Sequence, residues 1–196
     1  MPMSDTTAVS REHAVTALVS EYEALKAEER QRIGVRGQLL YATLTAVAGI
    51  ATVTATAGRL ELLLLLPLAT TVLGWSCVTN DHKIVFIGRY VRYRLGPRMV
   101  GLAGEFSSGI DMFDWEHYHR ADPLRRSRKW LQLAADMVAF CVPSLTAIAL
   151  LLLLGPHNPL VLIGSAAAII AVTILAAQIV RYAGAAGPDG GPARRP

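Results

Sequence analysis

Cysteine is scarce in this chain, and the common catalytic motifs are missing from it. Both of its cysteines, Cys77 and Cys141, lie inside long apolar runs. We therefore expect buried apolar side chains rather than a disulfide framework. The sequence has no His-Glu-x-x-His, Gly-x-Ser-x-Gly, phosphate-binding glycine loop or paired Cys-x-x-Cys pattern. These absences predict a protein that is not an enzyme and carries no cofactor.

Acidic and histidine side chains gather in the middle of the chain, but their spacing is not that of a metal site. They are Asp81, His82, Asp111, Asp114, Glu116, His117 and His119. His117 and His119 would point apart on a helix and together only on a strand. We expect a solvated, salt-bridged loop that holds no metal.

Charged residues are almost absent from four apolar runs, at residues 38–58, 60–79, 131–154 and 160–180. Each run has about 20 residues, the length of a helix that crosses a hydrocarbon core ~30 Å thick. Short turns at 58–59 and 155–159 join the runs in pairs. The first run begins too late and is too long for a cleaved signal. The sequence therefore predicts an all-α integral membrane four-helix bundle made of two transmembrane hairpins.

Basic residues are also almost absent from the two short turns, where Arg59 is the only one. The other eighteen of the nineteen lie in the N-terminal segment, the central loop and the tail. The positive-inside rule then places both termini and the central loop in the cytosol. Four aromatic rings near the same ends of the runs agree with this orientation: Tyr41, Trp75, Trp130 and Tyr182.

These patterns divide the chain into six segments. We expect disorder at 1–9, a cytosolic amphipathic helix at 10–36, the first transmembrane hairpin at 37–80, a basic and helical cytosolic loop at 81–129, the second hairpin at 130–182 and a disordered tail at 183–196. Gly96-Pro97 should stop the helix that continues from the second run. The helix at 10–36 has an apolar stripe that either covers the mouth of its own bundle or joins copies of the chain: Val15, Leu18, Tyr22 and Leu25.

Asp136 is the only acid well inside an apolar run. An ionisable group at that depth is costly and needs a partner. The candidate partners lie near the cytosolic ends of other runs: Arg36, Gln38, Gln178 and Arg181. The pair either fixes the register of the helices or contributes to a charged ring at the inner mouth of a pore.

A polar stripe follows one helical face of the first run: Gln38, Tyr41, Thr45, Thr52 and Thr56. Such a stripe either lines water or packs against other helices, with threonine hydroxyls bonded to their own backbone. Together with Asp136, these residues are the predicted pore lining. Four spans are few for enclosing a pore, so a channel would need several copies of the chain.

Cations and aromatic rings alternate in the central loop. The predicted ligand-binding set is Arg89, Tyr90, Arg92, Tyr93, Arg94, Arg98, Arg125, Arg126 and Arg128. Cations that hold phosphates beside rings that stack bases are typical of a protein that binds single-stranded oligonucleotides. The alternative is a polybasic segment that anchors on anionic lipid headgroups.

Short motifs along residues 20–130 resemble those of membrane effectors in bacterial conflict systems. They are Glu21-Tyr22-Glu23-Ala24-Leu25, Asp81-His82, Ile87-Gly88-Arg89-Tyr90-Val91 and Trp115-Glu116. Their order resembles that in a group of actinobacterial integral membrane proteins. More distantly, it is similar to that in the SLATT-type effectors, with the Hailong anti-phage type as the nearest comparison. A typical SLATT unit has two spans, whereas this chain has a second hairpin.

The resemblance implies an oligomeric ion channel whose opening depolarises the cell. For the Hailong type it also implies a partner nucleotidyltransferase whose DNA oligomers hold the channel shut. We therefore expect a homo-oligomeric channel of the bacterial inner membrane, gated by a cytosolic anionic ligand such as a short oligonucleotide, that acts in anti-phage defence. Its expected partners are the lipid bilayer, other copies of the chain and this ligand. The alternative is a non-catalytic membrane scaffold or partner subunit that binds anionic lipid through the basic loop.

Overall fold

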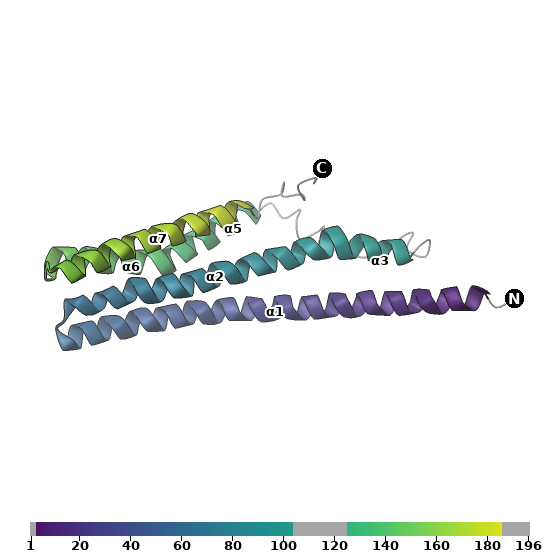
Figure 1. Cartoon of the computed structure of the whole chain (residues 1–196), viewed down its shortest axis with the longest axis horizontal. Helices are drawn as coiled ribbons and strands as arrows, with labels where there is room; N and C mark the ends of the chain where they lie inside the picture. The colour runs from purple at the N-terminus through teal and green to yellow at the C-terminus, as the bar shows by residue number, and fades with distance from the viewer. Residues whose placement is uncertain (1–2, 104–124, 186–196) are drawn as a thin grey trace. The chain divides into compact units, whose positions relative to one another are not determined.

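The computed structural model describes residues 3–103 and 125–185, and every element in this part of the chain is helical (Figure 1). The elements are α1 (Met3–Ala57), the 3₁₀ helix η1 (Leu60–Leu64), α2 (Leu65–Tyr90), the π-helix η2 (Val91–Leu95), α3 (Gly96–Ala103), α5 (Arg125–Asp136), the π-helix η4 (Met137–Cys141), α6 (Val142–Leu154) and α7 (Pro159–Ala185). Four stretches are long and apolar enough to cross a membrane: Glu12–Ala57, Leu60–Leu102, Trp130–Leu154 and Pro159–Tyr182. The predicted all-α, four-helix membrane protein is confirmed.

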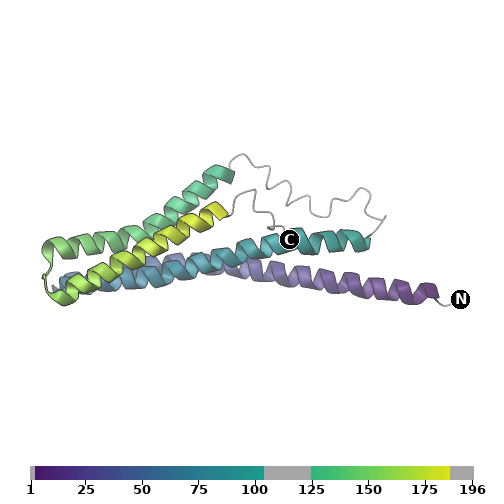
Figure 2. The same ribbon diagram turned by 45° about the horizontal axis from the view of Figure 1, so that its top comes forward.

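The chain divides into two compact units. The hairpin unit contains residues 1–34 and 83–125, and the bundle unit contains residues 35–82 and 126–196. Helices α1 and α2 both continue across the boundary between the units. Within the bundle unit, α6 and α7 pack against each other (Figure 2).

Helix α1 begins at Met3, well before Ser10, where the pattern predicts its start. Residues 3–9 are therefore helical, although the sequence predicts disorder there. This stretch contains neither glycine nor proline. A helix that is already nucleated further along can extend through it, because each added residue gains one backbone hydrogen bond.

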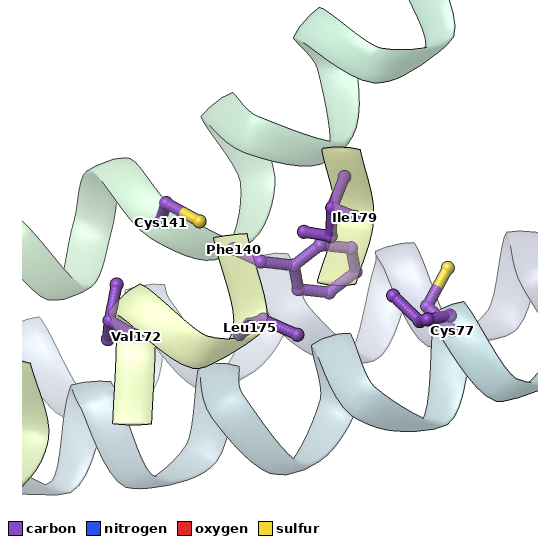
Figure 3. Packing of buried hydrophobic residues seen from close by; sticks show 7 residues of the cluster. Cys77, Phe140, Cys141, Val172, Leu175 and Ile179 are labelled. Carbon is purple, nitrogen blue, oxygen red and sulfur yellow. The ribbon is translucent and has the colours of Figure 1, made fainter. Parts of the chain in front are cut away.

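The main apolar cluster of the bundle unit joins α2, η4 and α7 (Figure 3). Its buried members are Cys77, Val78, Phe140, Cys141, Val172, Leu175 and Ile179. Both cysteines are free and buried, as the sequence predicts. Gly74 allows a close approach here, since a Cβ atom at this position would lie 2.7 Å from Leu175 Cδ2 and 3.1 Å from Phe140 Cγ. Small residues at such points let membrane helices pack closely.

Two short turns connect the membrane helices of the bundle unit. Gly58 follows α1 with a φ of 64°, a left-handed conformation that glycine adopts without a Cβ clash. In the other turn, the backbone N–H of Val161 donates to Asn158 Oδ1 at 2.8 Å, and Pro159 is the first residue of α7. An asparagine cap followed by proline favours the start of a helix. The local sequence therefore ends one helix and begins the next within a few residues.

Each π-helical segment lies directly before a residue that is followed by proline. Segment η2 precedes Gly96-Pro97, and η4 precedes Val142-Pro143. In both cases the residue before proline donates its N–H to the carbonyl five residues earlier. The wider turn relieves the clash that a proline ring makes with the preceding turn of an α-helix. Gly96-Pro97 therefore does not stop the helix, contrary to the prediction, and α3 continues to Ala103.

The hairpin unit has an apolar cluster of its own. Its buried members lie on α2 and η2: Ile87, Val91 and Leu95. Three residues of the predicted apolar stripe on α1 pack against them: Leu18, Tyr22 and Leu25. Val15, the fourth residue of the stripe, is more exposed. Most of the stripe is therefore covered by the same chain, within a helix that also continues into the first membrane span.

Candidate functional site

The polar stripe of α1 lies on the side of the helix that faces away from the interior of the bundle unit. Its members are all exposed: Gln38, Tyr41, Thr45, Thr52 and Thr56. The bundle covers residues on the opposite side of the helix: Leu39, Leu40, Thr43, Val47, Ile50 and Thr54. Tyr41 is 74% exposed, whereas Thr43 is 0% exposed. The helices that the structure describes therefore leave the polar stripe uncovered.

The threonine hydroxyls of this stripe are bonded to their own helix. Thr45 Oγ1 donates to the Tyr41 carbonyl at 2.9 Å, Thr52 to Ala48 at 2.8 Å, and Thr56 to Thr52 at 3.0 Å. Each hydroxyl is thus satisfied without a partner outside the helix. The hydroxyl oxygens keep lone pairs that can accept hydrogen bonds from water. This face can therefore line water or contact another copy of the chain.

Asp136 does not lie on the polar stripe, although the sequence predicts that both line one pore. The residue is only 9% exposed and lies inside the bundle unit. Its Oδ1 accepts a hydrogen bond from Arg36 Nη2 at 2.7 Å. Of the four candidate partners, Arg36 is therefore the one that the structure selects. This arrangement fits the alternative in which a buried pair fixes the register of the helices.

Arg36 contacts two further side chains besides Asp136. Its Nη1 forms an ion pair with Asp81 Oδ2. The side-chain oxygen of Gln132, turned toward the guanidinium, accepts hydrogen bonds from Nη1 at 3.0 Å and from Nη2 at 3.3 Å. These four residues, which we name the Arg36 cluster, connect α1, α2 and α5 within the bundle unit.

The Arg36 cluster is electrostatically uneven, because one guanidinium faces two carboxylates. All three charged side chains are largely covered, with between 12% and 25% of their surface exposed. Transferring such charges out of water costs several kcal/mol per ion, and the mutual attraction offsets this cost only when the geometry is good. The planar fork of arginine suits this task, since its nitrogens can reach both carboxylates at once.

Sequence reasoning missed the roles of Asp81 and Gln132. It placed Asp81 at the start of the basic loop, on the helix that continues from the second run, and considered it only for a metal site; the structure also places this residue inside a helix, α2. Arg36 and Asp81 are equally far along the chain from the Gly58-Arg59 turn. Antiparallel helices rise equally per residue, so such positions reach the same level. This symmetry is the signal by which the pair could have been found.

Tyr90 belongs to the predicted ligand set but faces α1 within the hairpin unit. Its hydroxyl donates to Glu21 Oε1 at 2.7 Å. This hydrogen bond to a carboxylate is the main reason why the pKa of Tyr90 is raised above its ordinary value. The hydroxyl therefore stays protonated and holds α2 against α1, so Tyr90 acts first as a packing residue.

The cations around Tyr90 are more open to solvent. Tyr93, Arg94 and Arg98 are exposed, and the Arg92 guanidinium lies 5.5 Å from the centre of the Tyr93 ring. That distance is within the range of a cation–π contact. The segment 83–103 contains five basic residues and no acidic residue. Its exposed surface therefore favours an anionic partner.

The remaining arginines of the predicted ligand set are Arg125, Arg126 and Arg128. They lie in the first turns of α5, and their side chains lie outside the described residues. Arg125 belongs to the hairpin unit, whereas Arg126 and Arg128 belong to the bundle unit. The structure therefore groups only the residues from Arg89 to Arg98 on one segment.

The structure assigns other partners to two of the residues considered for a metal site. Asp81 pairs with Arg36, and the His82 ring lies 5.1 Å from the Tyr182 ring. Among the described residues, no group of three or more His, Cys, Asp or Glu side chains is placed to hold a metal ion. The other considered residues, between 111 and 119, lie outside this part of the chain.

No protein-family model, curated protein or solved structure matches this chain. The resemblance to SLATT-type effectors therefore stays a prediction. The functional argument rests on the polar stripe of α1, the Arg36 cluster and the basic segment of the hairpin unit.

Proposed function

We propose that the protein is a homo-oligomeric ion channel in which the polar stripe of α1 lines the pore. The observation that carries this proposal is a polar face on a membrane helix that the other described helices scarcely cover. In the most apolar 18-residue stretch of α1, only 11% is buried, whereas the corresponding share in the other three membrane helices is 22% to 33%. In a single copy the polar stripe would face lipid. In a ring of copies the stripes would face one another and line a water-filled pore.

Charge supports an orientation with both termini and the hairpin unit in the cytosol of a bacterial inner membrane. Cytosolic segments of membrane proteins carry an excess of lysine and arginine. In this chain only Arg59 lies in a turn at the opposite end of the bundle. The ligand that gates the channel would then approach from the cytosol.

The exposed cations and the Tyr93 ring support an anionic ligand, such as a short single-stranded oligonucleotide. Arginine side chains would hold its phosphates, and the ring would stack on a base. The predicted role as an anti-phage defence effector rests on the resemblance of the sequence motifs. Opening of the channel would depolarise the cell.

Conductance of the purified protein in planar bilayers tests the channel proposal, together with its mass in detergent and in nanodiscs. We expect discrete conductance steps and a mass that is a multiple of one chain. If mass photometry finds only monomer in both environments, the channel proposal fails and the scaffold alternative leads.

The second candidate is a non-catalytic scaffold or partner subunit that binds anionic lipid. The same basic segment favours it, because polybasic segments beside membrane helices attract anionic headgroups. Binding of a labelled oligonucleotide to the protein in neutral-lipid nanodiscs separates the two candidates. A ligand site predicts binding that weakens steeply with salt and falls in the variant Arg92→Ala/Arg94→Ala, but not in the control Arg30→Ala, an exposed cation of α1. Absence of binding by the wild-type protein at low salt would end the nucleotide proposal.

A further inference from the structure

Two rows of side chains flank the polar stripe of α1 in the bundle unit, one on each side of it, within residues 35–57. The first flank contains Leu44, Ala48, Ala51 and Ala55. The second flank contains Ala42, Ala46, Gly49 and Val53. Both rows repeat at intervals of four, three and four residues, so each row follows one side of the helix. Ala46 is half-buried, and the other seven residues are exposed.

The flanks carry few large side chains for a surface that would face lipid. Within residues 35–57 the exposed large aliphatic side chains are Leu44 at 61% and Val53 at 54%. Helix α7, in the same unit, exposes seven of them: Leu160, Leu162, Ile163, Ile169, Ile170, Ile174 and Val180. Small residues on a membrane helix let another helix approach closely. The two flanks therefore have the composition of a contact between helices.

Gly49 supports the same conclusion independently, because the rest of the described chain does not require a glycine there. A Cβ atom at this position would have nothing within 4 Å, and Gly49 is not among the residues with positive φ. In the interior of a helix, glycine is less favourable than alanine by about 1 kcal/mol. The close approach of a helix from another copy would require a small residue at this point.

The two flanks match each other in shape when copies stand side by side in one membrane. Copies that share one orientation bring equal residue numbers to equal depth. Leu44 of one copy then lies between Ala42 and Ala46 of the next copy. Val53 of the second flank faces, in turn, the alanines at positions 51 and 55 of the first flank. Each flank therefore offers a large side chain where the other offers two small ones.

Like flanks match less well than unlike flanks. Two first flanks would place Leu44 against Leu44 and would leave the alanines of both copies apart. Such a contact joins only two copies, whereas a contact between unlike flanks passes from copy to copy and can close into a ring. Unlike flanks are therefore the better match in shape, and they also allow the several copies that a pore needs.

The area of the flanks also favours a ring over a pair. Residues 35–57 form a helix about 35 Å long and about 10 Å wide, so each flank offers roughly 350 Å². A ring buries both flanks of every copy, roughly 700 Å², which is close to the area of about 800 Å² that one partner contributes to a stable interface. A pair of copies would bury half of this area.

We propose that copies of the chain pack through unlike flanks of α1, with the first flank of one copy against the second flank of the next, in a closed ring. This inference rests on the proposed channel and names the surface that assembles it. Because the polar stripe lies between the two flanks, the contact turns the stripe toward the centre of the ring. The rest of the bundle unit then lies outside.

Oxidative cysteine crosslinking in nanodiscs tests this contact in a background of Cys77→Ala and Cys141→Ala. The reporter variant carries Leu44→Cys and Ala46→Cys, which point about 200° apart on one helix and cannot pair within a chain. We expect a ladder of bands at multiples of the chain mass for this variant and only monomer for each single variant. The matched control is Ala167→Cys with Ile169→Cys, an exposed pair with the same spacing on α7, which should give no ladder.

The possible failures of this experiment point to different causes. A dimer formed by Leu44→Cys alone would show that like flanks meet and would overturn the proposed contact. If mass photometry finds an oligomer but the reporter variant gives no ladder, the contact is wrong and the channel proposal stands. If mass photometry finds only monomer, both proposals fail.

The variant Gly49→Leu gives a second measurement that does not rely on engineered cysteines. It adds a large side chain where a single copy has open space, so the chain should keep its helical content in circular dichroism. We expect loss of the oligomeric mass in nanodiscs, because leucine blocks the approach of the next copy. The matched control is Ala166→Leu, an exposed position of α7, which should keep that mass. A Gly49→Leu protein that assembles as the wild type does would overturn the contact.

Discussion

At position 36, a single guanidinium holds side chains from two other helices. The sequence identifies Asp136 as an acid that needs a partner and includes Arg36 among the candidates, because both follow from the cost of a charge at membrane depth. It does not identify Gln132. The side-chain amide of Gln132 is uncharged, so the sequence alone does not indicate that it needs an ionic partner. Only the packing of α5 on α1 brings this amide to the Arg36 guanidinium.

Replacing Arg36 with methionine should destabilise the bundle by about 3–5 kcal/mol, because it leaves two carboxylates without a counter-charge in a largely covered site. Thermal or denaturant unfolding in detergent measures this loss. The matched control is Arg30→Met, which removes an exposed cation from the same helix and should change stability little.

The triple variant Arg36→Met/Asp81→Asn/Asp136→Asn should recover much of this stability, since no uncompensated charge remains. Equal stabilities for Arg36→Met and Arg30→Met would show that the Arg36 cluster does not hold the three helices together. A triple variant that is less stable than Arg36→Met alone would show that the carboxylates have other partners.

Gly74 provides a second test at the residue scale, in the apolar cluster of the bundle unit. Alanine at this position would force its methyl group against Leu175 and Phe140, and such overpacking costs about 1–3 kcal/mol. Alanine at Gly88, which has open space around it, should gain up to about 1 kcal/mol in helix propensity. Unfolding in detergent compares the two variants, and a Gly74→Ala protein as stable as wild type would contradict the packing.

At the scale of the elements, periodicity predicts the polar stripe of α1 but not the side of the bundle on which it lies. The spacing of three and four residues places Thr45, Thr52 and Thr56 on one face. Whether that face is covered depends on where α2, α6 and α7 pack, which is a long-range property. The π-helical segments escape prediction for a related reason. Proline signals a stop, whereas a wider turn before it lets the helix continue.

The variant Thr45→Val/Thr52→Val removes two hydroxyls from the polar stripe while it keeps the shape of the side chains. If the stripe lines the pore, single-channel conductance should fall, because apolar constrictions disfavour water and ions. The matched control is Thr173→Val on α7, which is also exposed and bonded to its own helix, at the Ile169 carbonyl. Equal conductance in all three proteins would remove the stripe from the pore.

At the scale of the whole molecule, the lengths of the apolar runs predict the four membrane helices and their two hairpins. The sequence also predicts that the second membrane helix continues past its apolar run, but the point where it ends is less predictable, because α3 continues beyond Gly96-Pro97 to Ala103. The Tyr90–Glu21 hydrogen bond joins residues 69 positions apart. No local pattern indicates such a contact, since it exists only once two helices have packed.

Topology gives the prediction at this scale. In a background of Cys77→Ala and Cys141→Ala, a cysteine at His157 should react with a membrane-impermeant maleimide added to intact cells, whereas a cysteine at Ser20 should react only after permeabilisation. The reason is that the basic residues favour the cytosolic side for the hairpin unit. Labelling of the Ser20 cysteine in intact cells would invert the proposed orientation.

The two short turns have a consequence for how the protein can receive signals. The glycine, asparagine and proline that close them leave almost no polypeptide beyond the ends of the membrane helices in the bundle unit. A macromolecule on that side of the membrane meets too few side chains to build an interface of ordinary size. A signal can therefore act on this protein through the bilayer or from the opposite side of the membrane. The two turns offer too little surface for a protein partner to bind.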